Sequence, residues 1–99
     1  MAEYLKNGCG LIAKERTHQI EKHGFTGEHH ANHPEWYDKG QLIEAASTLS
    51  MPVINGCALP INWDKDWFER LIKKSHKERL IISGALLAAE IDRIIELEK

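Results

Sequence analysis

The sequence predicts an all-α protein, a small compact bundle of about four helices with two long irregular loops and a central C-terminal helix. Three observations predict this fold. Apolar residues recur at helical spacing, capping residues stand at the ends of several of those segments, and residues 80–89 are apolar on nearly every side. A helix that is apolar all round is usually buried, so this one is expected at the centre of the domain or in a subunit interface. With 99 residues, the chain is expected to form a single domain, 1–99.

The first helix is predicted over residues 11–23, because apolar side chains recur on one side and Gly24 stands where a C-terminal cap is expected. Residues 24–38 mix glycine, proline, histidine and aromatic residues, and are expected to form a long loop. Loops of this length are uncommon in small domains and are often functional.

The second helix is predicted over residues 38–49, with Asp38 as the N-cap and Gln41 as its capping-box partner. A second irregular stretch, residues 50–62, follows and contains Pro52, Gly56 and Pro60.

The third helix is predicted over residues 63–74 with Asn62 as its N-cap, and its apolar side consists of Trp63, Trp67, Phe68, Leu71 and Ile72. Ser75 and Glu78 then form the S-x-x-E pattern of a capping box, which predicts that the last helix begins at His76 and runs to about Leu97.

Composition excludes several classes of partner. The net charge of −2 and the lack of a basic stripe argue against a nucleic-acid partner. The longest apolar run is too short to span a bilayer, and the N-terminus does not resemble a signal peptide. Cys9 and Cys57 form no close pair, which is typical of a reducing compartment. We therefore expect a soluble, cytoplasmic protein with neither a nucleic-acid nor a membrane partner.

Small residues recur four apart in the last helix, at Gly84 and Ala88 and again at Ala85 and Ala89. This spacing lets two helix backbones approach closely, either within one chain or between two copies. The helix also carries more apolar surface than three short helices are expected to cover, so a homo-oligomer is predicted.

Polar residues on otherwise apolar helix faces are the first candidate site. Glu15 and Gln19 share a face that borders the apolar side of their helix. Glu90 interrupts an apolar stretch and needs a partner if it is buried, which Arg93 or Arg16 could supply. The set forms either a structural ion pair or a ligand-binding site. If these side chains converge on one cavity, a ligand-binding site is favoured. If they are buried in pairs away from solvent, a structural ion pair is favoured.

Aromatic and histidine residues in the predicted loops are the second candidate. Trp36, Tyr37 and Trp63 either stack on a base or close the ends of the bundle. His29 and His30 would close the first loop over a ligand. Adjacent histidines usually point apart and no cysteine lies near them, so no metal site is predicted there.

Catalytic motifs are absent from the sequence, which contains no nucleophile elbow and no phosphate-binding glycine loop. A magnesium site built from Glu15, Glu44 and Glu90 would be the natural catalytic option, although Asp92 points to the far side of the last helix from Glu90. No catalytic residue, metal ligand or cofactor is therefore assigned, and enzymatic activity stays an open alternative.

Several segments form a set that is specific only when taken together: residues 15–19, 24–29, 40–46, 60–63 with Trp67, and 79–93. In this set the chain resembles a family of small, mostly uncharacterised proteins carried by bacteriophages and prophages. It departs from the family pattern at His30, where an acidic residue is usual, and at Gln41, where glutamate is common. The helix order is also faintly similar to that of all-α nucleotide pyrophosphohydrolases.

The resemblance implies a phage origin, and small phage proteins include sponges that sequester the nucleotide signals of bacterial defence systems. We therefore expect a helical homo-oligomer in the host cytoplasm that captures a nucleotide-derived small molecule. Its expected ligand-binding residues are Glu15, Arg16, Gln19, His29, His30, Trp36, Tyr37, Trp63, Glu90 and Arg93. The alternatives are a magnesium-dependent nucleotide pyrophosphohydrolase-like enzyme and a protein that binds a host protein through its apolar helix.

Overall fold

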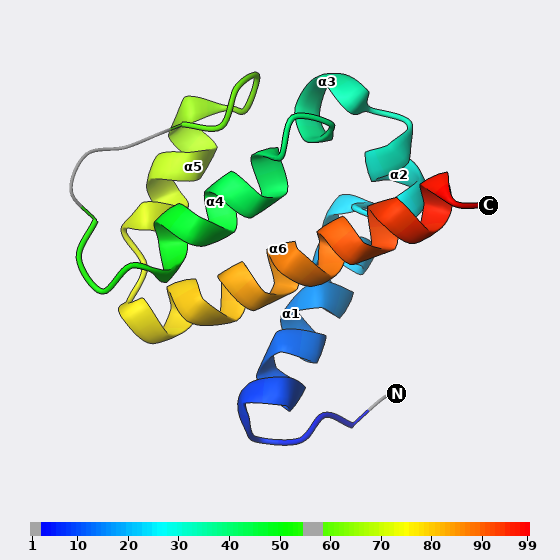
Figure 1. Cartoon of the computed structure of the whole chain (residues 1–99). Helices are drawn as coiled ribbons and strands as arrows, with labels where there is room; N and C mark the ends of the chain where they lie inside the picture. The colour runs from blue at the N-terminus through cyan, green and yellow to red at the C-terminus, as the bar shows by residue number, and fades with distance from the viewer. Residues whose placement is uncertain (1–2, 55–58) are drawn as a thin grey trace.

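A long C-terminal helix is the element against which most of the chain packs (Figure 1). The computed structural model describes residues 3–54 and 59–99, and within these ranges every regular element is an α-helix. The predicted all-α fold is confirmed. The helices are α1 (Gly8–His23), α2 (Gly27–Ala31), α3 (Pro34–Tyr37), α4 (Gln41–Ser50), α5 (Lys65–Ile72) and α6 (His76–Leu97). No helix in the described ranges is long and apolar enough to cross a membrane.

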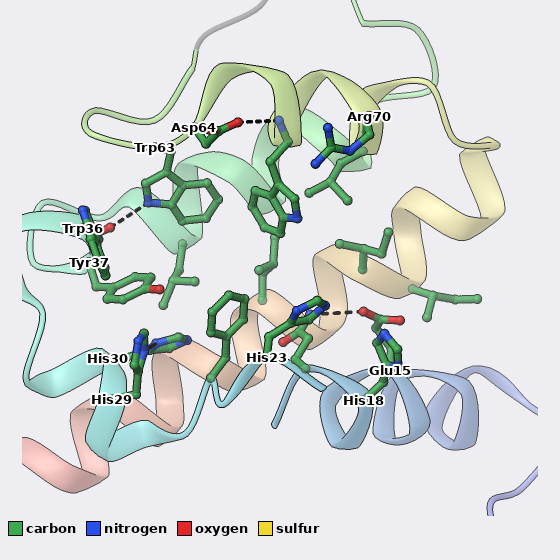
Figure 2. A pocket seen from close by; sticks show the side chains of 18 of the residues that line it. Glu15, His18, His23, His29, His30, Trp36, Tyr37, Trp63, Asp64 and Arg70 are labelled. Atoms are coloured by element: carbon green, nitrogen blue, oxygen red, sulfur yellow. Dashed lines mark hydrogen bonds between the residues drawn. The ribbon is translucent and has the colours of Figure 1, made fainter. Parts of the chain in front are cut away.

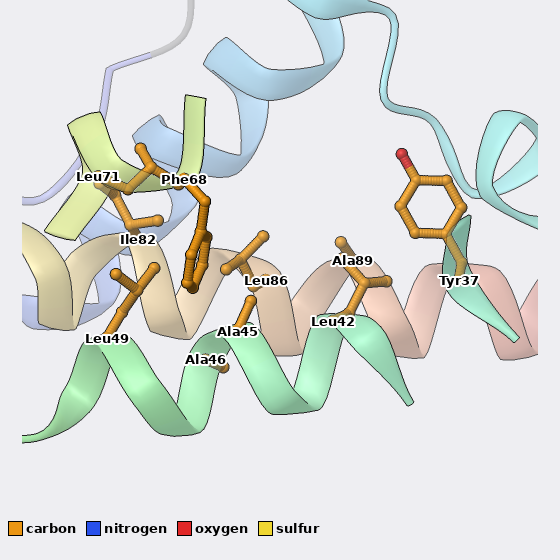
Figure 3. Close-up of a cluster of buried hydrophobic side chains, with 10 residues drawn as sticks. All are labelled: Tyr37, Leu42, Ala45, Ala46, Leu49, Phe68, Leu71, Ile82, Leu86 and Ala89. Carbon is orange, nitrogen blue, oxygen red and sulfur yellow. The ribbon is translucent and has the colours of Figure 1, made fainter. Parts of the chain in front are cut away.

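The hydrophobic core lies where α4 and α5 meet α6 (Figure 3). Ala89 of α6 is fully buried in this cluster, and the Ser83 hydroxyl of α6 donates to the Ala46 carbonyl of α4 at 3.0 Å. Phe68 of α5 is also fully buried, and Tyr37 of α3 closes one end of the core. The remaining core residues are Leu42, Ala45, Ala46, Leu49, Leu71, Ile82 and Leu86.

Two helix ends agree with the sequence prediction because their caps are local. Ser75 accepts a hydrogen bond from the backbone N–H of Glu78 at 3.2 Å and donates one to the Glu78 carboxylate at 3.0 Å. Gly24 ends α1 in the left-handed conformation, with φ of 68°. At its other end, α1 begins before the predicted Leu11, because Asn7 caps the helix by accepting from the N–H of Gly10.

The first predicted loop is wrong, because residues 24–38 contain α2 and α3. Thr26 caps α2 by accepting from the N–H of His29 at 3.0 Å, and Pro34 occupies the first turn of α3. In the second predicted loop, Ser50 is the last residue of α4 and the other described residues form no helix, while Gly56 and Cys57 lie outside the described residues.

Two predicted N-caps are also wrong. Helix α4 begins after Gly40, not at Asp38, and Gln41 accepts from the N–H of Lys39 while it donates to the Glu35 carbonyl. Helix α5 is capped by Asp64, which accepts from the N–H of Trp67 at 2.7 Å. Asn62, the predicted cap, instead adopts a φ of 70° and donates to the Glu35 carbonyl.

The small residues of α6 serve contacts inside the chain. A Cβ atom on Gly84 would lie 2.5 Å from Cδ1 of Ile12, so α1 crosses α6 at this glycine. Ala85 and Ala89 are both fully buried, and Ala89 belongs to the hydrophobic core. Three of the four small residues therefore allow close packing within one copy of the protein.

Gly27 places α2 directly on the backbone of α6. A Cβ atom at this position would lie 2.6 Å from the carbonyl oxygen of Asp92, which is closer than van der Waals contact allows. We expect Gly27→Ala to lower the free energy of unfolding by about 2 kcal/mol, because the backbone has to move to admit the methyl group. Chemical denaturation measures this change.

Gly8→Ala provides the matched control, since a Cβ atom there meets no atom within 4 Å. We expect that variant to unfold at the wild-type denaturant concentration or slightly above it. Equal stability of the Gly27 and Gly8 variants would contradict the close packing of α2 on α6.

Candidate functional site

A cleft of about 850 Å³ opens between α1 and α5, with residues of α6 at its base and α2 and α3 at one end (Figure 2). This volume lies within the range of about 300 to 1,000 Å³ that is typical of small-molecule sites. Of the predicted ligand-binding residues, the cleft brings together Glu15, Gln19, His29, His30, Trp36, Tyr37 and Trp63.

Aromatic rings form one end of the cleft. The ring centroids of Trp63 and Trp67 are 5.7 Å apart, and those of Tyr37 and Trp63 are 6.3 Å apart. Phe25, which precedes α2, meets Trp67 edge-to-face with the ring centroids 6.5 Å apart. These rings offer planar apolar surfaces that suit a flat ligand.

Hydrogen bonds to α3 hold Trp63 at this end of the cleft. Its indole Nε1 donates to the backbone carbonyl of Trp36 at 2.7 Å, and Asn62 Nδ2 donates to the carbonyl of Glu35 at 2.8 Å. Both carbonyls belong to a helix of only four residues, whose ends leave them free to accept. The chain that leads into α5 is therefore tied to α3, and Trp63 is oriented before any ligand arrives.

Two neutral histidines of α2 line the same end. The Nδ1 atoms of His29 and His30 are 3.2 Å apart, so the expectation that these adjacent rings point apart is wrong. Burial lowers the pKa of His30 to about 3, and the nearby Arg16 guanidinium adds to this effect. Burial also lowers the pKa of His29, with a further contribution from His33. Near neutral pH, each imidazole thus has one donor and one acceptor nitrogen.

Tyr37 lies between His30 and the aromatic end of the cleft. The centroid of its ring is 3.9 Å from that of His30, and Figure 2 shows its hydroxyl directed towards the cleft. Burial, assisted by Glu35, raises the pKa of Tyr37 to about 12. The phenol therefore stays protonated and available as a hydrogen-bond donor at physiological pH.

Charged residues gather at the opposite end of the cleft. Arg70 of α5 faces Glu15 and His18 of α1 across the opening (Figure 2). Among the described residues no ion pair involves Arg70, whereas Lys74 Nζ lies 3.9 Å from a Glu78 carboxylate oxygen. The cleft thus presents one guanidinium whose charge is not balanced by a direct contact with a described carboxylate.

Arg16, Glu90 and Arg93 do not line the cleft. Arg93 donates two hydrogen bonds to the carboxylate of Glu90, at 2.7 and 2.8 Å. Arg16 donates from Nε to Asp92 Oδ2 at 2.9 Å, and its Nη2 contacts the same oxygen at 2.9 Å. Both arginines and Glu90 are largely buried, and the Arg16–Asp92 pair joins α1 to the end of α6, which is the arrangement expected of a structural role.

Five further residues line the cleft that were not among the ligand-binding residues predicted from the sequence: Phe25, His18, His23, Trp67 and Arg70. A signal for part of this set is present in the sequence, because Trp63, Trp67, Arg70 and Lys74 are spaced by four, three and four residues. That spacing places them on one helical face. The missing information was that this face borders a cleft.

No group of three or more histidine, cysteine, aspartate or glutamate side chains is arranged to hold a metal ion within residues 3–54 and 59–99. Glu15 lines the cleft, Glu44 is exposed on α4, and Glu90 is held by Arg93. The three carboxylates considered for a magnesium site therefore do not converge. Comparisons of the chain with protein families, curated proteins and solved structures find no match.

Proposed function

We propose that the cleft between α1 and α5 binds and sequesters a small nucleotide-derived molecule. The observation that carries this proposal is the division of one cleft of about 850 Å³ into an aromatic end and an end that holds the Arg70 guanidinium. A nucleotide has the same division, with a planar base at one end and an anionic phosphate at the other.

The base is assigned to the aromatic end. Stacking of one base on an aromatic side chain contributes about 1 to 3 kcal/mol, and Trp63 and Trp67 both present rings there. The neutral imidazole of His29 and the protonated hydroxyl of Tyr37 supply the polar groups that a base edge needs. Because Trp63 is already tied to α3, binding costs little ordering of its side chain.

The phosphate is assigned to Arg70, whose planar guanidinium suits bidentate recognition of phosphate oxygens. His18 and His23 of α1 line the facing wall and add hydrogen-bond donors. Glu15 accepts a hydrogen bond from Gln19 at 3.4 Å. The remaining acceptor capacity of this carboxylate suits the hydroxyl groups of a ribose that lies between base and phosphate.

Sequestration is proposed in place of turnover because two of the three carboxylates that line the cleft have other roles. Asp64 caps α5, and Glu78 pairs with Ser75 and Lys74. The resemblance to phage proteins favours a sponge that removes a nucleotide signal of a bacterial defence system from the host cytoplasm.

Isothermal titration calorimetry with nucleoside monophosphates, cyclic dinucleotides, ADP-ribose and the matching free nucleosides tests the proposal. We expect Arg70→Ala to weaken binding of the phosphorylated ligands about 10- to 100-fold, since a hydrogen bond to a charged group contributes about 1.5 to 3 kcal/mol. Binding of the free nucleosides should not change. Trp67→Ala should weaken both groups of ligands.

Lys65→Ala is the matched control, because this lysine is an exposed cation of the same helix and does not line the cleft. The absence of binding heat for every compound would overturn the proposed site. Recovery of the bound ligand intact after heat denaturation supports sequestration, and recovery of hydrolysis products would overturn it.

A further inference from the structure

A stripe of large apolar side chains on α6 faces away from the core. It consists of Leu80, Leu87, Ile91, Ile94 and Ile95, whose exposed fractions range from 43% to 59%. Most of these residues follow one another at intervals of seven, four and three positions, which keeps them on one side of the helix. We call this set the α6 stripe.

No described helix covers the α6 stripe. Helix α4 packs along one flank of the stripe, where the Ser83 hydroxyl donates to the Ala46 carbonyl at 3.0 Å. Helix α1 crosses at Gly84, where Ile12 fills the space that a side chain would occupy. A row of five half-exposed leucine and isoleucine residues on one helix is typical of an interaction surface.

We propose that the α6 stripe binds the α6 stripe of a second copy of the chain, with the two helices antiparallel about a twofold axis at Leu87. Three of the five stripe positions are symmetric about this point, since Leu80 lies seven residues before Leu87 and Ile94 lies seven residues after it. In an antiparallel pair, Leu80 of one copy therefore packs beside Ile94 of the other, and the two Leu87 side chains meet at the axis.

Charge at the two ends of α6 favours the same arrangement. Lys77 is exposed ten residues before Leu87, and Glu98 is exposed eleven residues after it. An antiparallel pair brings Lys77 of each copy beside Glu98 of the other, which forms two ion pairs by symmetry. A parallel pair would bring lysine beside lysine and glutamate beside glutamate, which is unfavourable.

The length of the stripe sets the expected strength of the dimer. From Leu80 to Ile94 the helix rises about 21 Å, at about 1.5 Å per residue. Stable interfaces usually bury about 800 Å² on each partner, and five leucine and isoleucine side chains that are already about half covered provide less than this. We therefore expect a dimer that dissociates on dilution.

Sedimentation equilibrium over a range of protein concentrations tests the proposal. We expect the wild-type chain to be dimeric at the highest concentrations and Leu87→Lys to be monomeric throughout. Val53→Lys is the control, because Val53 is 71% exposed and lies outside α6; this variant should dimerise like the wild type. The proposal would be overturned if the wild-type chain were monomeric at every concentration. Binding of a different protein by this monomer would not rescue it.

Charge reversal tests the orientation without altering an apolar residue. Lys77→Glu and Glu98→Lys should each weaken the dimer several-fold, and the double variant should restore wild-type association. These exposed positions lie at the ends of α6, so the substitutions leave the core intact. If the double variant is no better than the single ones, the antiparallel pairing is wrong. Leu87 does not line the cleft, so a failure of Leu87→Lys to dimerise can be distinguished from a failure of the cleft to bind nucleotides.

Discussion

Replacement of Arg79 by methionine is expected to lower the free energy of unfolding by about 3 to 4 kcal/mol. The Arg79 side chain is buried, with 6% of the residue exposed, and its guanidinium donates to four backbone carbonyls. These belong to Leu49 at 2.9 Å, Met51 at 2.7 Å, Pro52 at 3.3 Å and Lys74 at 3.2 Å. One side chain of α6 thus supplies hydrogen bonds to backbone carbonyls at or just beyond the C-terminal ends of α4 and α5. Its loss leaves these carbonyl groups unpaired.

Thermal unfolding followed by circular dichroism measures this effect, and the melting temperature should fall by more than about 12 °C for a domain of this size. Arg79→Lys retains the charge but reaches fewer carbonyls, so its melting temperature should lie between those of the methionine variant and the wild type. Lys65→Met removes an exposed cation from α5 and should change the melting temperature by no more than a few degrees. A methionine variant as stable as this control would show that the carbonyls find other partners.

Local chemistry explains which helix ends could be predicted. Ser75 and Gly24 act on groups within three to five residues of themselves, so their capping roles follow from the sequence alone. Asn62 fails as a predicted cap because its side chain binds the carbonyl of Glu35, 27 residues earlier. A tertiary contact of that kind has no local signature in the sequence. With Asn62 engaged in this contact, Asp64 caps α5 in its place.

The candidate site shows the same limit. The aromatic residues of the cleft could be selected from the sequence, because flat apolar side chains in poorly periodic segments are unusual. The arginines could not be assigned, since the outcome depends on which carboxylate each one meets. Arg16 meets Asp92, whose spacing from Glu90 had excluded it from the candidate carboxylates, and Arg93 meets Glu90. Arg70 therefore remains as the arginine that lines the cleft, beside Lys74, which pairs with Glu78.

Between pH 7 and pH 4, the wild-type protein is expected to lose about 2 to 3 kcal/mol of stability through His30 alone. The His30 pKa is lowered from 6.5 to about 3 in the folded protein, first by burial and then by the charges of Arg16, His29 and Arg93. Only 2% of the residue is exposed. As the pH falls through 6.5, the unfolded chain binds a proton at this position that the folded chain does not bind. Stability falls by about 1.4 kcal/mol for each pH unit between the unfolded and the folded pKa of His30, and the loss is complete as the pH approaches 3.

His30→Phe isolates the contribution of this histidine, because phenylalanine retains the stacking on Tyr37 and carries no titratable nitrogen. Guanidinium denaturation from pH 7 to pH 4 should therefore give a shallower decline for His30→Phe than for the wild type. His76→Gln, which removes an exposed histidine, should follow the wild-type curve. Parallel curves for His30→Phe and the wild type would mean that His30 accepts a proton in the folded protein near its ordinary pKa, and that the histidine end of the cleft is charged in mild acid.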